Sequence, residues 1–180
     1  MNKIIIALMF LSCSVSQAGE NWLGFEDKIS KSNYLTAQQN YGNWCALVDN
    51  VQNPSPKSKT LKQLMKWVNK NIGYMPETSE IWKSASQTYH DMEGDCEDLS
   101  ILFCSIARKK GFDVRVAIGH YRIKNKWFGH SFNIWIDSSH KKIWVIDCTN
   151  KYIVDSSKTK LYKITYSFDD KKIYRHSEVK

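Results

Sequence analysis

Hydrophobic residues in the first half of the chain recur at the three- and four-residue intervals that are typical of helices. The clearest early case is the segment 60–74, TLKQLMKWVNKNIGY, in which one side carries the apolar residues. These residues are Leu61, Leu64, Met65, Val68 and Ile72. We also expect a helical segment at 34–48, and a weaker helix or an ordered loop at 80–93. The front half is therefore predicted to be helical.

The strongest helix signal begins at the pentapeptide GDCED. Gly94 supplies a turn, Asp95 is a favourable N-cap, and Asp98 stands where a capping-box acid belongs. An apolar stripe at helical spacing follows, namely Leu99, Leu102, Phe103 and Ile106. The segment 108–111, RKKG, ends this helix with cations and a glycine. Cys96 lies on the same side as the stripe, so its sulfur is expected to point toward whatever the helix packs on.

The second half changes to an alternation of apolar and polar residues, which indicates strands with a buried face. Five segments show it: 112–122, 130–137, 142–147, 161–168 and 171–176. Polar turns separate these segments, so an antiparallel sheet is predicted. Helices followed by strands indicate a single α+β domain, with the helix that begins at Cys96 packed on the sheet.

Two consecutive strands carry polar residues on the side that is expected to be buried, and they should form a hairpin. If Ser138 pairs with Lys141 across the turn, Phe132 lies opposite Asp147. His130 is then the same-face neighbour of Asp147, two residues along. Such diagonal neighbours are about 7–8 Å apart at the backbone, within reach of a hydrogen bond between a carboxylate and an imidazole.

If the helix packs on that same face, Cys96 lies beside His130. The three residues then form a nucleophile, a base and a group that orients the base, which is the arrangement for acyl transfer through a thioester. The helix N-terminus favours the thiolate and could present the Cys96 amide to an oxyanion. Each residue also has an ordinary structural explanation when taken singly. His120, at the end of its strand, is the competing candidate for the base.

Residues 1–18 have the layout of an export signal, with Lys3, the apolar run IIIALMFL and a small-x-small cleavage site that ends at Ala18. Cleavage there would leave one domain, residues 19–180. The apolar run is too short to span a bilayer, and no later stretch is long and apolar enough. We therefore expect an exported, periplasmic protein. In an alternative interpretation, Cys13 is a lipoprotein attachment site.

The formal net charge is +8, with 26 Lys and Arg residues against 18 Asp and Glu residues. This excess suits an acidic partner or surface. Lysine pairs are scattered through the predicted turns, and the chain lacks the arginine stripe with interleaved aromatic residues that a nucleic-acid binder needs. The composition therefore argues against nucleic acid as a partner, and we expect a monomer.

Four cysteines follow the expected cleavage site, and an oxidising compartment would favour disulfides among them. They are Cys45, Cys96, Cys104 and Cys148. Their spacing does not match the CxxC pattern of zinc or redox sites. We expect Cys45 to pair with Cys148, because Cys148 points to the sheet face opposite Asp147.

The order GDCEDLSILFCSIARKKGFDVRVAIGHY, then GHSFNIWID, then WVIDCTN resembles the transglutaminase-like superfamily. The upstream run LKQLMKWVNKNIGY is similar in layout to the bacterial transglutaminase-like cysteine peptidases, which include a periplasmic calcium-dependent protease that clips surface adhesins and releases biofilms. The resemblance covers about 44–150. It implies a papain-like fold with Cys96 as nucleophile, His130 as base and Asp147 as the orienting residue.

The resemblance also implies that the acids around the cysteine bind calcium, namely Asp95, Glu97 and Asp98. The negative charges of these acids disfavour the thiolate of Cys96. A bound cation would reverse the sign of the electrostatic field at the thiol. In the alternative interpretation, these acids only cap the helix. The chain departs from the adhesin-releasing enzymes at SFNIW and DCT, which weakens the expectation of an adhesin substrate more than that of a thiol mechanism.

The sequence therefore predicts an exported thiol hydrolase, a peptidase that acts on an exported or surface protein such as an adhesin. Two alternatives come from other functional classes. In one, the same fold is a catalytically silent module that binds a peptide or protein. In the other, Cys96, His130 and Asp147 ligate zinc.

Overall fold

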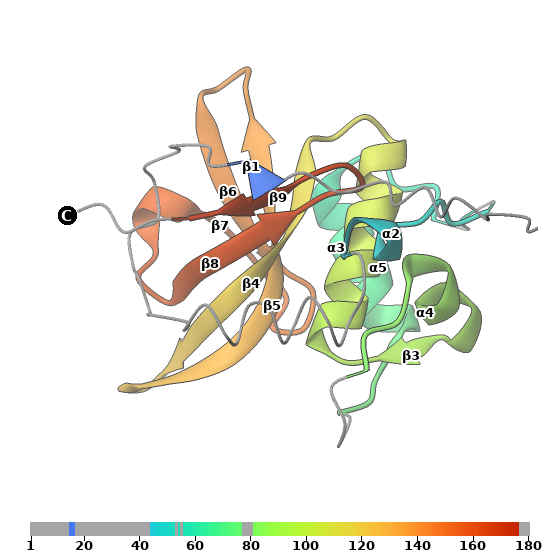
Figure 1. The fold of residues 1–180 in the computed structure, drawn as a ribbon, viewed down its shortest axis with the longest axis horizontal. Helices are drawn as coiled ribbons and strands as arrows, with labels where there is room; N and C mark the ends of the chain where they lie inside the picture. The colour runs from blue at the N-terminus through green and yellow to red at the C-terminus, as the bar shows by residue number, and fades with distance from the viewer. Residues whose placement is uncertain (1–14, 17–43, 53, 55, 77–80, 177–180) are drawn as a thin grey trace, which may run out of the picture.

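The computed structural model describes residues 15–16, 44–52, 54, 56–76 and 81–176. It contains one large sheet with the helices gathered on one side of it, and α5 is the helix next to the sheet (Figure 1). The predicted α+β architecture is confirmed.

The large sheet has the strand order β1-β9-β8-β4-β5-β6-β7. Its strands are β1 (Val15–Ser16), β4 (Val114–Ile123), β5 (Lys126–Asp137), β6 (Lys142–Asp147), β7 (Tyr152–Asp155), β8 (Tyr162–Phe168) and β9 (Ile173–Arg175). All neighbouring strands are antiparallel, except that β1 runs parallel to β9. The five predicted strands correspond to β4, β5, β6, β8 and β9. The sequence did not predict β7, because four residues are too few to establish an alternation.

The helices of the described residues are α2 (Trp44–Leu47), α3 (Leu61–Asn71), α4 (Ala85–Asp91) and α5 (Cys96–Lys109), with a short 3₁₀ turn, η1 (Ser156–Lys158), after β7. Helices α3 and α5 form where the hydrophobic spacing predicted helices, and the segment predicted as a weaker helix or an ordered loop at 80–93 contains a short helix, α4. Thr60 caps α3, since its hydroxyl accepts from the backbone nitrogen of Gln63 at 3.2 Å. After α5, Gly111 has a φ of +87°, a left-handed conformation that glycine adopts readily at a helix C-terminus.

The β5–β6 hairpin has the register that the sequence predicted. Asn133 pairs with Ile146, and the same register sets Phe132 opposite Asp147. The residues of β5 before Asn133 pair with β4 on one side. On the side where β6 lies, they pair with no strand among the described residues. The sheet is therefore open along this edge of β5.

Two clusters of buried apolar side chains fill the two faces of the sheet. The cluster on the α5 side includes the strand positions Val114, Val116, Ile146 and Phe168, together with Cys148 directly after β6. The cluster on the opposite face uses alternate positions, which include Ala117, Phe132, Ile134, Val145 and Ile164. Because successive side chains of a strand point to opposite faces, the central strands are buried on both sides.

This burial on both sides corrects one sequence expectation. His130 shares its face of β5 with Phe132. Asp147 shares its face of β6 with Val145. The prediction that α5 packs on the face of His130 and Asp147 is therefore wrong, because α5 packs on the opposite face. Alternation identified a buried face, but it could not show that the other face is buried as well and receives the helix.

The expected disulfide is also wrong. Cys104 and Cys148 are buried free thiols, so Cys148 does not pair with Cys45. The thiol of Cys104 donates to the carbonyl oxygen of Val114 at 3.3 Å. Both thiols act as small core residues on the α5 side of the sheet.

Several expectations lie wholly or largely outside the described residues. They are the export signal at 1–18, of which only β1 is described, the lipoprotein site at Cys13, and most of the helical segment 34–48. None of the described helices has both the length and the apolar surface needed to cross a bilayer.

Candidate active site

Cys96, the candidate nucleophile, is the first residue of α5, and Asp95 is the N-cap. Gly94 is required here because an added Cβ would lie 2.5 Å from the Cβ of Asp98. The carboxylate of Asp98 accepts hydrogen bonds from the backbone nitrogens of Asp95, at 3.4 Å, and Lys83, at 2.8 Å. Asp98 therefore has the capping role that the sequence indicated.

β3 (Glu93–Gly94) leads directly into this helix start, and β2 (Gly73–Tyr74) pairs with it in parallel. Tyr74 lies beside the cluster at Cys96. Burial, followed by the negative charges of Cys96 and its acidic neighbours, raises the pKa of Tyr74. Tyr74 remains half exposed. No sequence signal identified Tyr74, because only the tertiary pairing of two very short strands brings it there.

His130 and Asp147 form a hydrogen-bonded pair, as the predicted register requires. Nε2 of His130 lies 2.8 Å from Oδ2 of Asp147, whose side chain is fully buried. Burial raises the pKa of Asp147, but the hydrogen bond and charge of His130 and the hydrogen bonds of Asn150 hold it below its ordinary value. Asp147 thus stays ionised, and Nδ1 is the ring nitrogen that can take a proton. Asp147 contacts His130 rather than His120, the competing candidate.

Two further residues hold Asp147, and the sequence reasoning missed both. Asn150 donates from its backbone nitrogen to Oδ1 and from Nδ2 to Oδ2, each at 2.9 Å. Tyr162 donates its hydroxyl to Oδ2 at 3.0 Å. The turn DCTN could have indicated Asn150, because Asp side chains often accept from the backbone of the turn that they begin. No sequence signal could have identified Tyr162, because β4 and β5 lie between its strand and β6.

Cys96 lies at the open edge of β5. The backbone N–H of Ser131 donates to the sulfur of Cys96, so the thiol lies at the residue next to His130. Ser131 precedes Asn133, where the pairing of β5 with β6 begins, so no β6 residue occupies this position. A helix on one face of the sheet therefore brings its first residue to a histidine that belongs to the other face. Cys96, His130 and Asp147 lie in one region.

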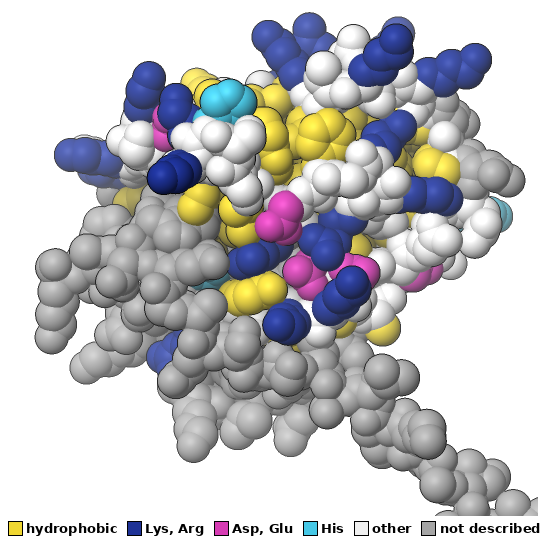
Figure 2. Space-filling model, turned by 90° about the horizontal axis from the view of Figure 1, so that it is seen from above, with side chains coloured by type: hydrophobic (Ala, Val, Ile, Leu, Met, Phe, Trp, Pro, Cys, Tyr) yellow, Lys and Arg dark blue, Asp and Glu magenta, His cyan; other side chains and the backbone are white. Residues whose placement is uncertain are grey.

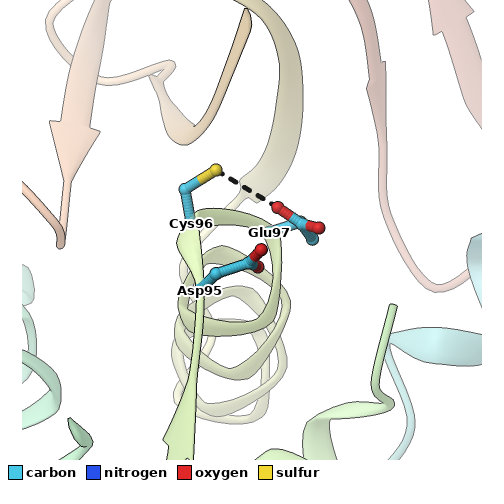
Figure 3. Close-up of side chains that lie close together, drawn as sticks. All are labelled: Asp95, Cys96 and Glu97. Atoms are coloured by element: carbon cyan, nitrogen blue, oxygen red, sulfur yellow. Dashed lines mark hydrogen bonds between the residues drawn. The ribbon is translucent and has the colours of Figure 1, made fainter. Parts of the chain in front are cut away.

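The surroundings of Cys96 favour the protonated thiol. Figure 3 shows the first turn of α5, where the thiol of Cys96 donates to Oε2 of Glu97 at 3.1 Å. Burial, followed by the charge of Glu97, raises the pKa of Cys96 well above its ordinary value. Burial, with the hydrogen bond and charge of Asp95, raises the pKa of Glu97 to about 8. Forming the thiolate therefore requires a positive charge or a proton acceptor beside this cluster.

The cluster of Asp95, Cys96 and Glu97 has the chemistry of a cation site. It is the one group of three candidate metal ligands among the described residues, with ligand atoms within 4.8 Å of one another. Oδ1 of Asp95 is buried and has no hydrogen-bond partner there. Burying such an oxygen is costly, and a cation would satisfy it. Because calcium prefers oxygen ligands, the Asp95 and Glu97 carboxylates fit this ion.

Two other predicted ligand sets fit less well. Asp98 is not in the cluster, because its carboxylate faces backbone N–H groups. The alternative zinc set of Cys96, His130 and Asp147 is not among the ligand groups of the described residues, because the three ligand atoms do not all lie within 4.8 Å of one another.

A family model described as the transglutaminase-like superfamily matches residues 46–154, which is more than half of the chain. No curated protein matches.

Three solved structures of Legionella pneumophila LapG are similar to this fold. The first shares 20% identity, covers 83% of this chain and 90% of LapG, and has a TM-score of 0.56. The EGTA-treated protein shares 19% identity, with coverages of 83% and 87% and a TM-score of 0.58. The calcium-bound protein shares 20% identity, with coverages of 84% and 91% and a TM-score of 0.57. At this level of identity, the likeness supports the fold.

Proposed function

The chain belongs to the transglutaminase-like superfamily, and we propose that it is a thiol hydrolase that cleaves peptide bonds of a protein substrate. The proposal rests on the hydrogen bond of 2.8 Å between His130 and Asp147, with the thiol of Cys96 at the adjacent amide of Ser131. A nucleophile, a base and an orienting acid in this order are the parts that acyl transfer requires.

Each of the three residues has one role in the reaction. Nδ1 of His130 takes the proton of Cys96, and the thiolate attacks the carbonyl carbon of the scissile bond. Asp147 fixes the ring and stabilises the imidazolium. His130 then gives the proton to the leaving amine, which departs as the thioester forms. Water, deprotonated by His130, hydrolyses the thioester and restores the thiol.

The start of α5 helps to stabilise the negative charge of the oxyanion that forms during the reaction. The backbone N–H groups in the first turn of a helix have no partner within the helix and form a partly positive end. The amide of Cys96 belongs to this turn, and in our proposal it donates to the oxyanion of the tetrahedral intermediate.

Calcium is the proposed cofactor, held by Asp95 and Glu97. A similar structure contains calcium, and the buried oxygen of Asp95 is suited to a cation. When bound, the ion would supply the positive charge that counters Glu97 beside Cys96 and lowers the cost of the thiolate. Asp98 acts as the capping-box acid of α5 in this scheme.

The proposed setting is the periplasm, reached through the export signal at 1–18. The substrate class is an exported or surface protein, such as an adhesin, and the net charge of +8 favours an acidic one. We propose that the chain acts as a monomer.

The rate of Cys96 alkylation by iodoacetamide tests this function. We expect rapid labelling near pH 7 with calcium, and labelling about 100-fold slower in His130→Ala, because the base is lost. His90→Ala is the matched control, since the His90 side chain is 84% exposed. Mass spectrometry separates Cys96 from the buried thiols of Cys104 and Cys148.

One observation favours a second function, a binding module without catalysis. The raised pKa of Cys96 is that of an unreactive buried thiol. The binding module replaces the hydrolase if the labelling rate, plotted against pH, has its midpoint at or above the free-thiol pKa of about 8.5. That outcome also requires that neither calcium nor His130→Ala changes the rate.

A further inference from the structure

One side of α3 and the loop before it carry five exposed lysines. They are Lys57, Lys59, Lys62, Lys66 and Lys70, and together we call them the α3 basic face. Lys62, Lys66 and Lys70 are four residues apart, so they line one side of the helix, where like charges repel. In the described parts of the chain, no carboxylate forms an ion pair with any of the five. The α3 basic face is therefore a concentrated charge that an acidic partner would neutralise.

Two hollows border the α3 basic face. The first has a volume of about 580 Å³, and Lys57, Lys66 and Lys70 line it together with Trp67. The second has a volume of about 310 Å³ and lies between the first turn of α3 and the sheet. Apolar side chains form most of its wall, namely Leu61, Phe112, Trp135, Trp144, Ile146 and Ile153, while Lys59 and Lys62 also line it.

Lysines of the α3 basic face therefore border an apolar hollow. Figure 2 shows one face of the molecule on which hydrophobic side chains gather, with Lys and Arg side chains and some Asp and Glu side chains around them. A partner that complements the α3 basic face carries carboxylates to meet the lysines and apolar side chains to fill the second hollow. An acidic protein segment with interspersed apolar residues has this chemistry.

α3 leads from these hollows toward the candidate active site. Its 11 residues span about 16 Å, and its C-terminal end continues into β2 and Tyr74, which lies beside Cys96. Near this end, Nδ2 of Asn69 donates to the carbonyl oxygen of Cys148 at 2.8 Å, one residue after Asp147. An extended peptide that runs along α3 would cover it with about five residues and arrive at the thiol.

We propose that the α3 basic face binds an acidic segment of the protein substrate, located within roughly ten residues of the cleaved bond. The inference rests on the proposed function, since it specifies the substrate class of the same site. The apolar hollow accepts side chains that alternate with the acids. Recognition is electrostatic at exposed lysines, so it weakens as salt shortens the screening length, which is about 10 Å at 0.1 M.

Binding is tested separately from catalysis with the full chain carrying Cys96→Ala. The probe is a fluorescein-labelled 14-residue peptide of alternating Glu and Leu, and anisotropy gives its Kd. We expect the double variant Lys62→Glu and Lys66→Glu to raise the Kd at least tenfold. Lys126→Glu with Lys160→Glu is the matched control, because it changes the net charge equally at two other exposed lysines. The control should change the Kd less than threefold.

Equal weakening by both pairs, or equal binding of a peptide with Gln in place of Glu, would overturn the proposal. A second measurement uses the wild-type active site. The α3 double variant should lower kcat/KM at least tenfold for a peptide substrate with an acidic extension, but not for the same substrate without it. Its alkylation rate at Cys96 should be unchanged.

The two proposals fail in different ways. If Cys96 is unreactive but the peptide still requires Lys62 and Lys66, the hydrolase is wrong and the binding surface remains. If Cys96 is reactive but neither binding nor kcat/KM depends on these lysines, the acidic-segment proposal is wrong.

Discussion

The hydroxyl of Tyr162 donates to Oδ2 of Asp147 at 3.0 Å, the same oxygen that lies 2.8 Å from Nε2 of His130. Burial, followed by the charge of Asp147, raises the pKa of Tyr162, so the hydroxyl stays a donor. The ring of Tyr162 packs on Phe132, with centroids 4.8 Å apart. We therefore expect Tyr162 to position His130 through Asp147.

Replacing Tyr162 with Phe keeps the ring and removes this hydrogen bond. A hydrogen bond to a charged group contributes about 1.5–3 kcal/mol, so we expect the alkylation rate of Cys96 to fall about tenfold. NMR of the His130 ring should show faster exchange of the Nε2 proton, which a general loss of stability would not produce. Tyr152→Phe is the control, since Tyr152 is 46% exposed. Unchanged alkylation and an unchanged His130 signal in Tyr162→Phe would show that Tyr162 has no positioning role.

Calcium should stabilise the folded chain through Asp95 and Glu97. At a calcium concentration 100 times the Kd, binding to the native state adds about 2.7 kcal/mol, which raises the Tm. Asp95→Asn and Glu97→Gln should each abolish most of the calcium-dependent shift, measured by differential scanning fluorimetry with calcium and with EGTA. Glu93→Gln is the matched control, because Glu93 is exposed on the adjacent β3. An equal shift in all four proteins would place the ion elsewhere.

Acid should destabilise the domain through His176. Burial and the charge of Arg115 lower the pKa of His176 to about 4, and its Nε2 lies 2.7 Å from the hydroxyl of Ser167. Because the folded pKa lies below the unfolded value, the stabilisation is complete above about pH 6.5 and is lost as pH falls toward 4. The loss amounts to about 3 kcal/mol.

Urea unfolding at several pH values measures this dependence. His176→Gln should lose less stability between pH 7 and 4 than the wild type, by about 3 kcal/mol, whereas His90→Gln should follow the wild type. If His176→Gln and the wild type have parallel pH profiles, His176 is not the group responsible.

Gly119 should tolerate no side chain. It pairs with His130 across β4 and β5, and an added Cβ would lie 1.9 Å from the carbonyl oxygen of Lys163 on β8. Because the backbone of β4 or β8 would have to move to make room for the methyl group, Gly119→Ala should destabilise the chain by at least 1–3 kcal/mol. The Tm should fall by several degrees. Gly129→Ala is the matched control, since a Cβ added there would meet no atom of a neighbouring segment within 4 Å. Equal Tm values for the two variants would contradict the close approach of β8.

By itself, the sequence determined the elements that depend on neighbouring residues. GDCED specified the start of α5, because a turn glycine, an N-cap and a capping acid act within five residues. The short turn after Asp137 specified the β5–β6 register, and this register joins His130 to Asp147.

Only the tertiary structure decided what depends on the packing of distant segments. Both faces of the sheet are buried in the folded chain, so the alternation of apolar and polar residues along the strands could not show on which face α5 packs. The tertiary structure also left Cys148 as a free thiol and brought Tyr162 and Tyr74 to the site from strands remote in sequence. The physical reason is that local spacing sets the direction of each side chain along its own element, whereas the arrangement of elements sets which side chains meet.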